Sequence, residues 1–258
     1  MYKLAVIKTT SCSGCVNELL YALTSSPALI ENYEIKYFTE IVDSDELDNE
    51  IDIVFVEGSI SNLKQESLLR SIREKAKFVV AIGTCAAFGG VQALRVGENL
   101  DTVKGSIYPN PGYVDVYSDV KSIDSIIRVD FVFPGCPVNG NAIASFLRKY
   151  TLGGLPITFY ESVCGDCKRR GIECVMVSKG IPCLGSVTNS GCGAICPSFN
   201  RGCYGCFGVK SFDIDKDKLK IFTDALTKLG IGKKEPQILF KGFSYKVYST
   251  LTRGELNE

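Results

Sequence analysis

The sequence predicts an α/β fold, in which a parallel β-sheet is followed by a second, loop-rich region. Between residues 2 and 154, short apolar segments alternate with segments whose apolar residues recur at helical spacing. Beyond residue 154 this alternation stops, and eight of the twelve cysteines lie in the glycine-rich stretch 164–206. We therefore expect two domains, residues 1–155 and residues 156–258.

The first domain contains five segments with the apolar composition of buried strands. They are residues 2–8, 33–42, 52–60, 77–85 and 129–137. Helical patterns are present at residues 16–25, 62–76 and 138–154, and a further helix is expected at 215–230. Strands that alternate with helices in this way form a parallel sheet covered on both faces. Residues 91–128, which contain many Gly, Pro, Asn and Asp residues, are expected to form a loop excursion rather than core.

The charge balance and the lack of histidine argue against several classes of function. Lys and Arg together number 29, as do Asp and Glu, so no basic surface for nucleic acid is indicated. The basic run Lys168-Arg169-Arg170 is expected to be a solvated surface turn. The chain has no histidine, which excludes histidine acid–base catalysis and histidine metal ligation within it. No apolar run reaches the roughly 18 residues that span a bilayer, so no direct membrane span is expected.

The stretch 164–206 has too few periodic apolar residues to form an ordinary core, so a group bound to its sulfurs must stabilise it. Its cysteines are Cys164, Cys167, Cys174, Cys183, Cys192, Cys196, Cys203 and Cys206. Disulfides are one explanation, but the N-terminal residues show no secretory signal, and we expect a cytoplasmic protein. Structural zinc is a second explanation, but only the two outermost pairs have the CxxC spacing of zinc knuckles.

Iron–sulfur clusters are the third explanation for this stretch, and the one that we favour. Each cluster takes four thiolates, and Cys-Pro is common at a terminal ligand, as in Cys136-Pro137 and Cys196-Pro197. The eight cysteines make two sets of four. Their spacing differs from the ferredoxin run, so an inserted ferredoxin domain is not indicated.

The other four cysteines follow predicted strands of the first domain. Cys12 and Cys15 come after the first strand, Cys85 after the fourth and Cys136 after the fifth. Open α/β sheets bind their ligands at the carboxyl ends of the strands, so we expect these thiols to meet in one crevice. Lone cysteines are by default small buried hydrophobic residues. Four of them at equivalent strand ends instead predict a third cluster.

These residues resemble a known family. The segments SCSGC (11–15), GTCAAFGG (83–90) and PGCPVNG (134–140) are similar to the cluster-binding segments of the small subunits of [NiFe] hydrogenases. The segment 181–208 resembles the iron–sulfur part of the soluble, cytoplasmic branch, which includes sulfhydrogenase delta subunits and methanogen hydrogenase gamma subunits. The resemblance covers about residues 4–208. It implies a flavodoxin-like first domain and an iron–sulfur second domain with a C-terminal helical tail.

The resemblance also implies three [4Fe–4S] clusters and their ligands. The proximal cluster would be held by Cys12, Cys15, Cys85 and Cys136. Chain order and the family pattern suggest Cys164, Cys167, Cys174 and Cys183 for the distal cluster. They suggest Cys192, Cys196, Cys203 and Cys206 for the medial cluster. No catalytic residue is expected in this chain, because the NiFe centre would lie in a partner large subunit, and a flavin- or iron–sulfur-containing subunit would accept the electrons.

Three positions depart from the membrane-linked members of that family. Those members have a histidine ligand where this chain has Cys164, and a proline where it has Cys196, so a four-iron medial cluster is expected here. Their proton-route glutamate corresponds to Asn17 in this chain, and the nearest carboxylate, Glu18, is one residue later. One residue turns a helix by about 100°. The role is therefore not carried over, and Glu18 is interpreted as a first-turn helix carboxylate.

Two other functions stay open at this point. One is the related cluster-bearing subunit of respiratory complex I, which has adjacent cysteines at its first motif, whereas Cys12 and Cys15 are separated here. The other is a zinc-stabilised interaction module without a redox role. A flavin or nucleotide enzyme is disfavoured, because neither GxGxxG nor GxxxxGK[ST] stands at a strand–helix turn.

Overall fold

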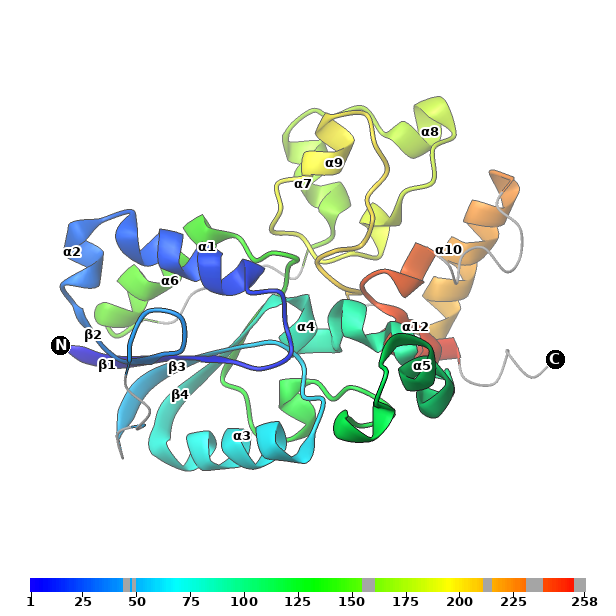
Figure 1. Cartoon of the computed structure of the whole chain (residues 1–258). Coiled ribbons are helices and arrows are strands. Elements are labelled where there is room, and N and C mark those ends of the chain that lie inside the picture. Colours follow the sequence, from blue (N-terminus) through cyan, green and yellow to red (C-terminus); the bar gives the residue numbers. More distant parts are fainter. Residues whose placement is uncertain (44–46, 48–49, 155–160, 211–214, 231–238, 253–258) are drawn as a thin grey trace.

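A five-stranded parallel sheet lies at the centre of the N-terminal part of the chain (Figure 1). The computed structural model describes residues 1–43, 47, 50–154, 161–210, 215–230 and 239–252. The strands are β1 (Tyr2–Lys8), β2 (Tyr33–Phe38), β3 (Ile51–Glu57), β4 (Ala76–Ile82) and β5 (Phe131–Phe133), in the order β2-β1-β3-β4-β5. All four neighbouring pairs are parallel. The predicted α/β fold is confirmed.

Helices cover both faces of this sheet, because successive strand residues point to opposite sides. Leu4, Val6 and Phe55 pack on one face against α1 (Gly14–Thr24) and α6 (Gly140–Thr151). Ala5, Ile7 and Val54 pack on the other face against Leu69 and Ile72 of α3 (Leu63–Lys75). A short helix, α2 (Pro27–Ile30), leads into β2. Figure 1 shows α1, α2 and α6 on one side of the sheet and α3 on the other.

Strand ends were predicted less well than strand positions. β2 ends at Phe38 rather than at residue 42, because Ile41 N and Val42 N donate to the Phe38 carbonyl in a turn. β4 ends at Ile82 rather than at residue 85, and α4 (Gly83–Phe88) begins directly after it. Gly83 has φ +90°, which turns the chain out of the strand. Helices α1, α3, α6 and α10 (Lys216–Lys228) match their predicted ranges to within three residues at each end.

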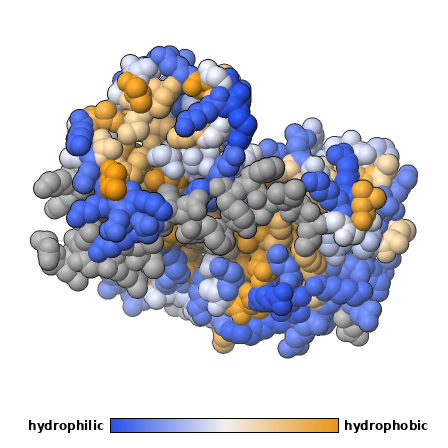
Figure 2. Space-filling model, turned by 180° about the vertical axis from the view of Figure 1, so that it is seen from behind, coloured by the Kyte–Doolittle hydropathy of each residue, from blue (hydrophilic) through white to orange (hydrophobic). Residues whose placement is uncertain are grey.

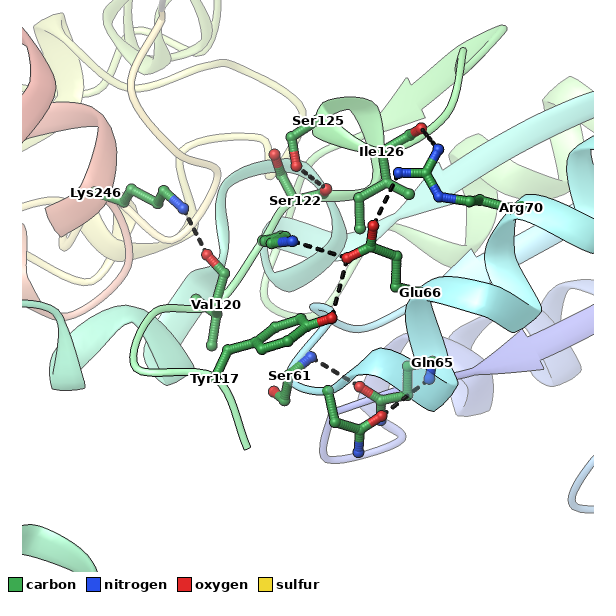
Figure 3. A network of polar contacts seen from close by, with 12 residues as sticks. Ser61, Gln65, Glu66, Arg70, Tyr117, Val120, Ser122, Ser125, Ile126 and Lys246 are labelled. Carbon is green, nitrogen blue, oxygen red and sulfur yellow. Dashed lines mark hydrogen bonds and ion pairs between the residues drawn. The ribbon is translucent and has the colours of Figure 1, made fainter. Parts of the chain in front are cut away.

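The prediction that residues 91–128 lie outside the core is wrong in part. The segment contains α5 (Leu100–Ile107), and η1 (Gly90–Arg95), η2 (Pro111–Tyr113) and η3 (Ile123–Ser125) are 3-10 turns. Ile123 and Ile127 are buried in the core beneath α3. Polar contacts add to this packing: Tyr117 Oη and Lys121 Nζ both donate to Glu66 of α3 (Figure 3). The polar composition of this segment gave no indication that a few of its apolar residues would be buried in the tertiary fold.

The C-terminal part consists of loops and several helices, of which only α10 was predicted as a segment from the sequence. It contains α7 (Val163–Arg169), α8 (Val175–Lys179), the 3-10 turn η4 (Leu184–Ser186) and α9 (Ile195–Ser198), followed by α10 and α12 (Tyr245–Thr252). Leu184 and Val187 share a small core with Leu226 of α10 and Phe240. The predicted domain boundary at residues 155–156 lies outside the described residues. Within the described part of the chain, no helix has both the length and the apolar character needed to cross a membrane.

Candidate cluster-binding sites

Four of the cysteines lie at the carboxyl edge of the sheet. Cys12 follows β1, Cys15 lies in the first turn of α1, Cys85 lies in α4 and Cys136 follows β5. The charges of Cys85 and Cys136 act on the thiol of Cys15, and those of Cys136 and Cys12 act on the thiol of Cys85. The structure therefore brings together the four residues that the sequence singled out. Cys85 reaches the edge from α4, which follows β4 directly.

Glycines leave space around two of these sulfurs. A Cβ atom at Gly83 would lie 2.5 Å from the Sγ of Cys15, and one at Gly90 would lie 2.6 Å from the Sγ of Cys85. Cβ atoms do not approach other atoms so closely, so any other residue would displace these sulfurs. Both glycines also have positive φ, at 90° and 58°. Backbone conformation and space thus both require glycine at these positions.

A buried carboxylate lies beneath this group of thiols. Glu57, at the end of β3, is 2% exposed and accepts hydrogen bonds from the backbone N–H groups of Cys15 and Val16, each at 3.2 Å. Burial raises the pKa of Glu57, and the two N–H bonds oppose that shift. Glu57 therefore anchors the N-terminus of α1, which carries Cys15. Glu57 was not predicted from the sequence, although a carboxylate at the end of a parallel strand was a usable signal.

The first group of C-terminal cysteines gathers around α7. Burial, together with the charges of Cys164, Cys183 and Cys174, raises the pKa of Cys167 to about 11. A Cβ at Gly185 would lie 3.4 Å from the Sγ of Cys183 and 3.7 Å from the Sγ of Cys164, so these two sulfurs flank the same glycine. Cys174 is exposed at the start of α8.

The second group lies in the following loop and beside α9. Burial, together with the charges of Cys192 and Cys196, raises the pKa of Cys206 to about 11. Cys203 is 7% exposed, and burial raises its pKa to about 12. Cys183 also interacts with this group, because its charge acts on Cys196 and Cys203, and Cys203 N donates to its Sγ at 3.2 Å. Cys183 therefore lies between the two groups.

The loop that ends the second group packs against the N-terminal domain. Gly208 has φ +74°, and a Cβ there would collide with the ring of Phe88 in α4. The ring of Phe207 lies against both Gly135 and Gly191. Asn139 Nδ2 donates to the carbonyl of Gly191 at 3.0 Å. The charge of Cys136 also acts on Cys206, so the sheet-edge thiols and the second group are close together.

Glu18 has a different role from the one expected. Its carboxylate accepts a hydrogen bond from Gly140 N at 3.1 Å, at the start of α6. The first turn of its own helix, α1, contains no acidic residue. Glu18 thus joins α1 to the N-terminus of a neighbouring helix, where negative charge is favourable. Asn17, the other position considered, is exposed.

The residues present fit thiolate-bound clusters in their chemistry. Among the described residues, no three Cys, Asp or Glu side chains are grouped tightly enough to hold one metal ion, so the fit depends on the donors and the space around them. The Gln92 side chain hydrogen-bonds the thiol of Cys85, and Gly205 N donates to the Sγ of Cys203 at 3.4 Å. Ser11 Oγ, beside Cys12, is buried without a hydrogen-bond partner in the described part of the chain. Such donors stabilise ligated sulfur and tune its redox potential.

Comparisons with known proteins identify the family. The family model described as NADH ubiquinone oxidoreductase, 20 Kd subunit, matches residues 12–150. Sulfhydrogenase 2 subunit delta of Pyrococcus furiosus is 36% identical over 206 residues, which cover 80% of this chain and 86% of that protein. This chain belongs to the family of the NADH ubiquinone oxidoreductase 20 Kd subunit, in the branch that contains hydrogenase subunits. A subunit of the F420-non-reducing hydrogenase vhu of Methanocaldococcus jannaschii is 34% identical, covering 86% of this chain and 88% of the relative.

Solved structures agree with this assignment. A chain of the NAD+-reducing [NiFe]-hydrogenase in the H2-reduced state matches with a TM-score of 0.55 and 25% identity, covering 62% of this chain and 96% of that one. A chain of the Dm. baculatum [NiFeSe]-hydrogenase matches with a TM-score of 0.54 over 82% of this chain, and at 19% identity it shows a shared fold. The resemblance to hydrogenase small subunits inferred from the cysteine segments is confirmed. The chain is a subunit of an oxidoreductase of the hydrogenase type.

Proposed function

We propose that this chain is the electron-transfer subunit of a [NiFe] hydrogenase. It would relay electrons between the NiFe centre of a partner large subunit and a downstream acceptor subunit. The observation that carries the proposal is the meeting of Cys12, Cys15, Cys85 and Cys136 at the sheet edge, in a chain whose relatives are named as hydrogenase subunits. Three [4Fe–4S] clusters would supply the one-electron carriers.

The chain's own residues would hold and separate these carriers. The four sheet-edge cysteines would bind the proximal cluster. Cys164, Cys167, Cys174 and Cys183 would bind the distal cluster, and Cys192, Cys196, Cys203 and Cys206 the medial one. The mutual effects of the thiol charges support this division, apart from Cys183, which interacts with both C-terminal groups. Because the buried thiols have raised pKa values, cluster binding must release their protons.

An exposed apolar surface near α8 and α9 supports an acceptor subunit as a partner. Val177 is 85% exposed and Phe199 is 73% exposed, and Cys174 lies at the surface in the same region. Figure 2 shows hydrophobic residues on the exterior of the lobe that carries these helices. The acceptor would contain flavin or iron–sulfur centres. The cytoplasmic location expected from the sequence stays a prediction.

Metal analysis of the anaerobically purified protein tests the proposal. We expect about twelve irons and as many sulfides per chain, since each of three clusters carries four. EPR spectra of the reduced protein should show interacting clusters, and a co-purified large subunit should contain nickel. Zinc in place of iron would refute the proposal and favour the structural zinc module.

Paired serine variants test how the cysteines are shared. Cys85→Ser should lose about four irons, and Cys85→Ser/Cys136→Ser should lose no more, because both residues serve one cluster. The cross-group control Cys85→Ser/Cys174→Ser should lose about eight irons. The double variants Cys183→Ser/Cys164→Ser and Cys183→Ser/Cys196→Ser show in the same way which cluster Cys183 serves. The pair that shares a cluster should lose no more iron than either single variant. Additive losses for Cys183 and Cys164 would overturn the proposed distal set.

A further inference from the structure

The hydroxyl of Thr84 connects two of the candidate cluster sites. Thr84 lies in α4, directly before Cys85, and is 1% exposed. Its Oγ1 accepts a hydrogen bond from Gly135 N at 3.1 Å and donates one to the backbone carbonyl of Cys206 at 2.5 Å. Thr84 N also donates to the Gly135 carbonyl at 2.8 Å. Thr84, itself the neighbour of Cys85, thus contacts through its side chain the residue before Cys136 and the backbone of Cys206.

Chemistry fixes the direction of both bonds. A backbone N–H only donates and a carbonyl only accepts, so the single hydroxyl proton of Thr84 must point to Cys206. The hydroxyl is buried, so water cannot replace it at low cost. Thr84 and Cys206 are 122 residues apart in sequence, and this bond spans the junction where Gly208 packs on Phe88.

We propose that Thr84 is a positioning residue that sets the separation between the proximal and medial clusters. This inference rests on the proposed function, because it needs clusters in both sites. Removing the hydroxyl leaves the Cys206 carbonyl and the buried Gly135 N–H without this hydrogen-bond partner, and the Cys203–Cys206 loop must shift to satisfy the carbonyl. The ligands Cys85 and Cys136 remain, so both clusters still bind, at an altered separation.

The test compares Thr84→Val, which keeps the shape and loses the hydroxyl, with Thr84→Ser, which keeps the hydroxyl. Thr9→Val is the matched control. The buried Thr9 hydroxyl donates to the Glu57 carbonyl at 2.9 Å and, among the described residues, forms no hydrogen bond to the C-terminal cysteine groups. Readouts are iron content and the magnetic interaction between reduced clusters in EPR spectra. We expect full iron in all variants, loss of the wild-type splitting in Thr84→Val only, and recovery in Thr84→Ser.

Every other result would overturn the inference. Wild-type splitting in Thr84→Val overturns the inference while leaving the proposed function intact. Loss of the splitting in Thr84→Ser or in Thr9→Val also overturns it, because packing or general destabilisation would then explain the effect. Loss of iron in Thr84→Val also overturns it, because the hydroxyl would then be needed for cluster binding and not for the separation of bound clusters. A wild-type protein without iron overturns the proposed function and this inference with it.

Discussion

Glu57 and Glu66 are carboxylates whose pKa values shift in opposite directions. Glu57 is enclosed beneath the sheet-edge thiols, and burial raises its pKa. Glu66 accepts hydrogen bonds from Lys121 Nζ and Arg70 at 2.8 Å each and from Tyr117 Oη at 3.1 Å, and these partners lower its pKa to about 2 (Figure 3). The environment of each side chain, and not its residue type, decides the direction.

Glu66→Gln should lower the free energy of unfolding at neutral pH and make that free energy less dependent on pH in the acid range. The folded pKa of Glu66 lies below the unfolded value of about 4.3, so its contribution is present above that value. It is lost as pH falls from about 5 towards about 2. Urea unfolding midpoints at several pH values should therefore show a gap between wild type and variant that closes in acid. Glu74→Gln, on an exposed position of the same helix, is the control, and a gap independent of pH would contradict the assignment.

At the scale of elements, the junction between α4 and the Cys203–Val209 loop depends on close backbone approach. Gly208 has a positive φ and lies against the Phe88 ring, while the Phe207 ring lies against Gly135. Backbone and ring contacts therefore hold the second cysteine group against the sheet domain. This junction also contains Thr84.

Gly208→Ala should destabilise the protein more than the same change at Gly97. Both glycines have positive φ, at 74° and 86°, so each alanine has a similar backbone cost of about 1–2 kcal/mol. Only at Gly208 does the added Cβ meet a side chain, since nothing lies within 4 Å of the Gly97 position. Overpacking adds about 1–3 kcal/mol. Denaturant unfolding measures both variants, and equal losses would mean that the contact with Phe88 is unimportant.

At the scale of the molecule, the C-terminal helices belong to the same packed unit as the cysteine-rich segment. Leu226 of α10 and Phe240 share a core with Leu184 and Val187, next to Cys183. Lys246 of α12 donates to the Val120 carbonyl and pairs with Asp119 at 2.8 Å, which ties this unit to the 91–128 segment. Helices α10 and α12 therefore pack against the cysteine-rich segment and the 91–128 segment.

Leu226→Ala should cost about 2–5 kcal/mol of unfolding free energy, as expected for a fully buried leucine. Ile221→Ala on the same helix is the control, because Ile221 is 69% exposed and should change stability by no more than about 0.5 kcal/mol. Thermal unfolding with iron retention as a second readout tests this. If Leu226→Ala lowered the unfolding free energy no more than Ile221→Ala does, α10 would not be part of the core.

Local sequence patterns were enough to predict the parallel sheet, the main helices and the twelve candidate thiols. Apolar periodicity and cysteine position are local signals, and parallel strand ends bring Cys12, Cys85 and Cys136 to one edge by topology alone. The burial of Ile123, the anchoring by Glu57, the contact of Glu18 with α6 and the hydrogen bonds of Thr84 became visible only in the folded chain. These partners are far apart in sequence: Thr84 meets Cys206, and Glu18 meets Gly140, across 122 residues each. No local pattern encodes such pairings, because they form only when packed elements bring the two partners together.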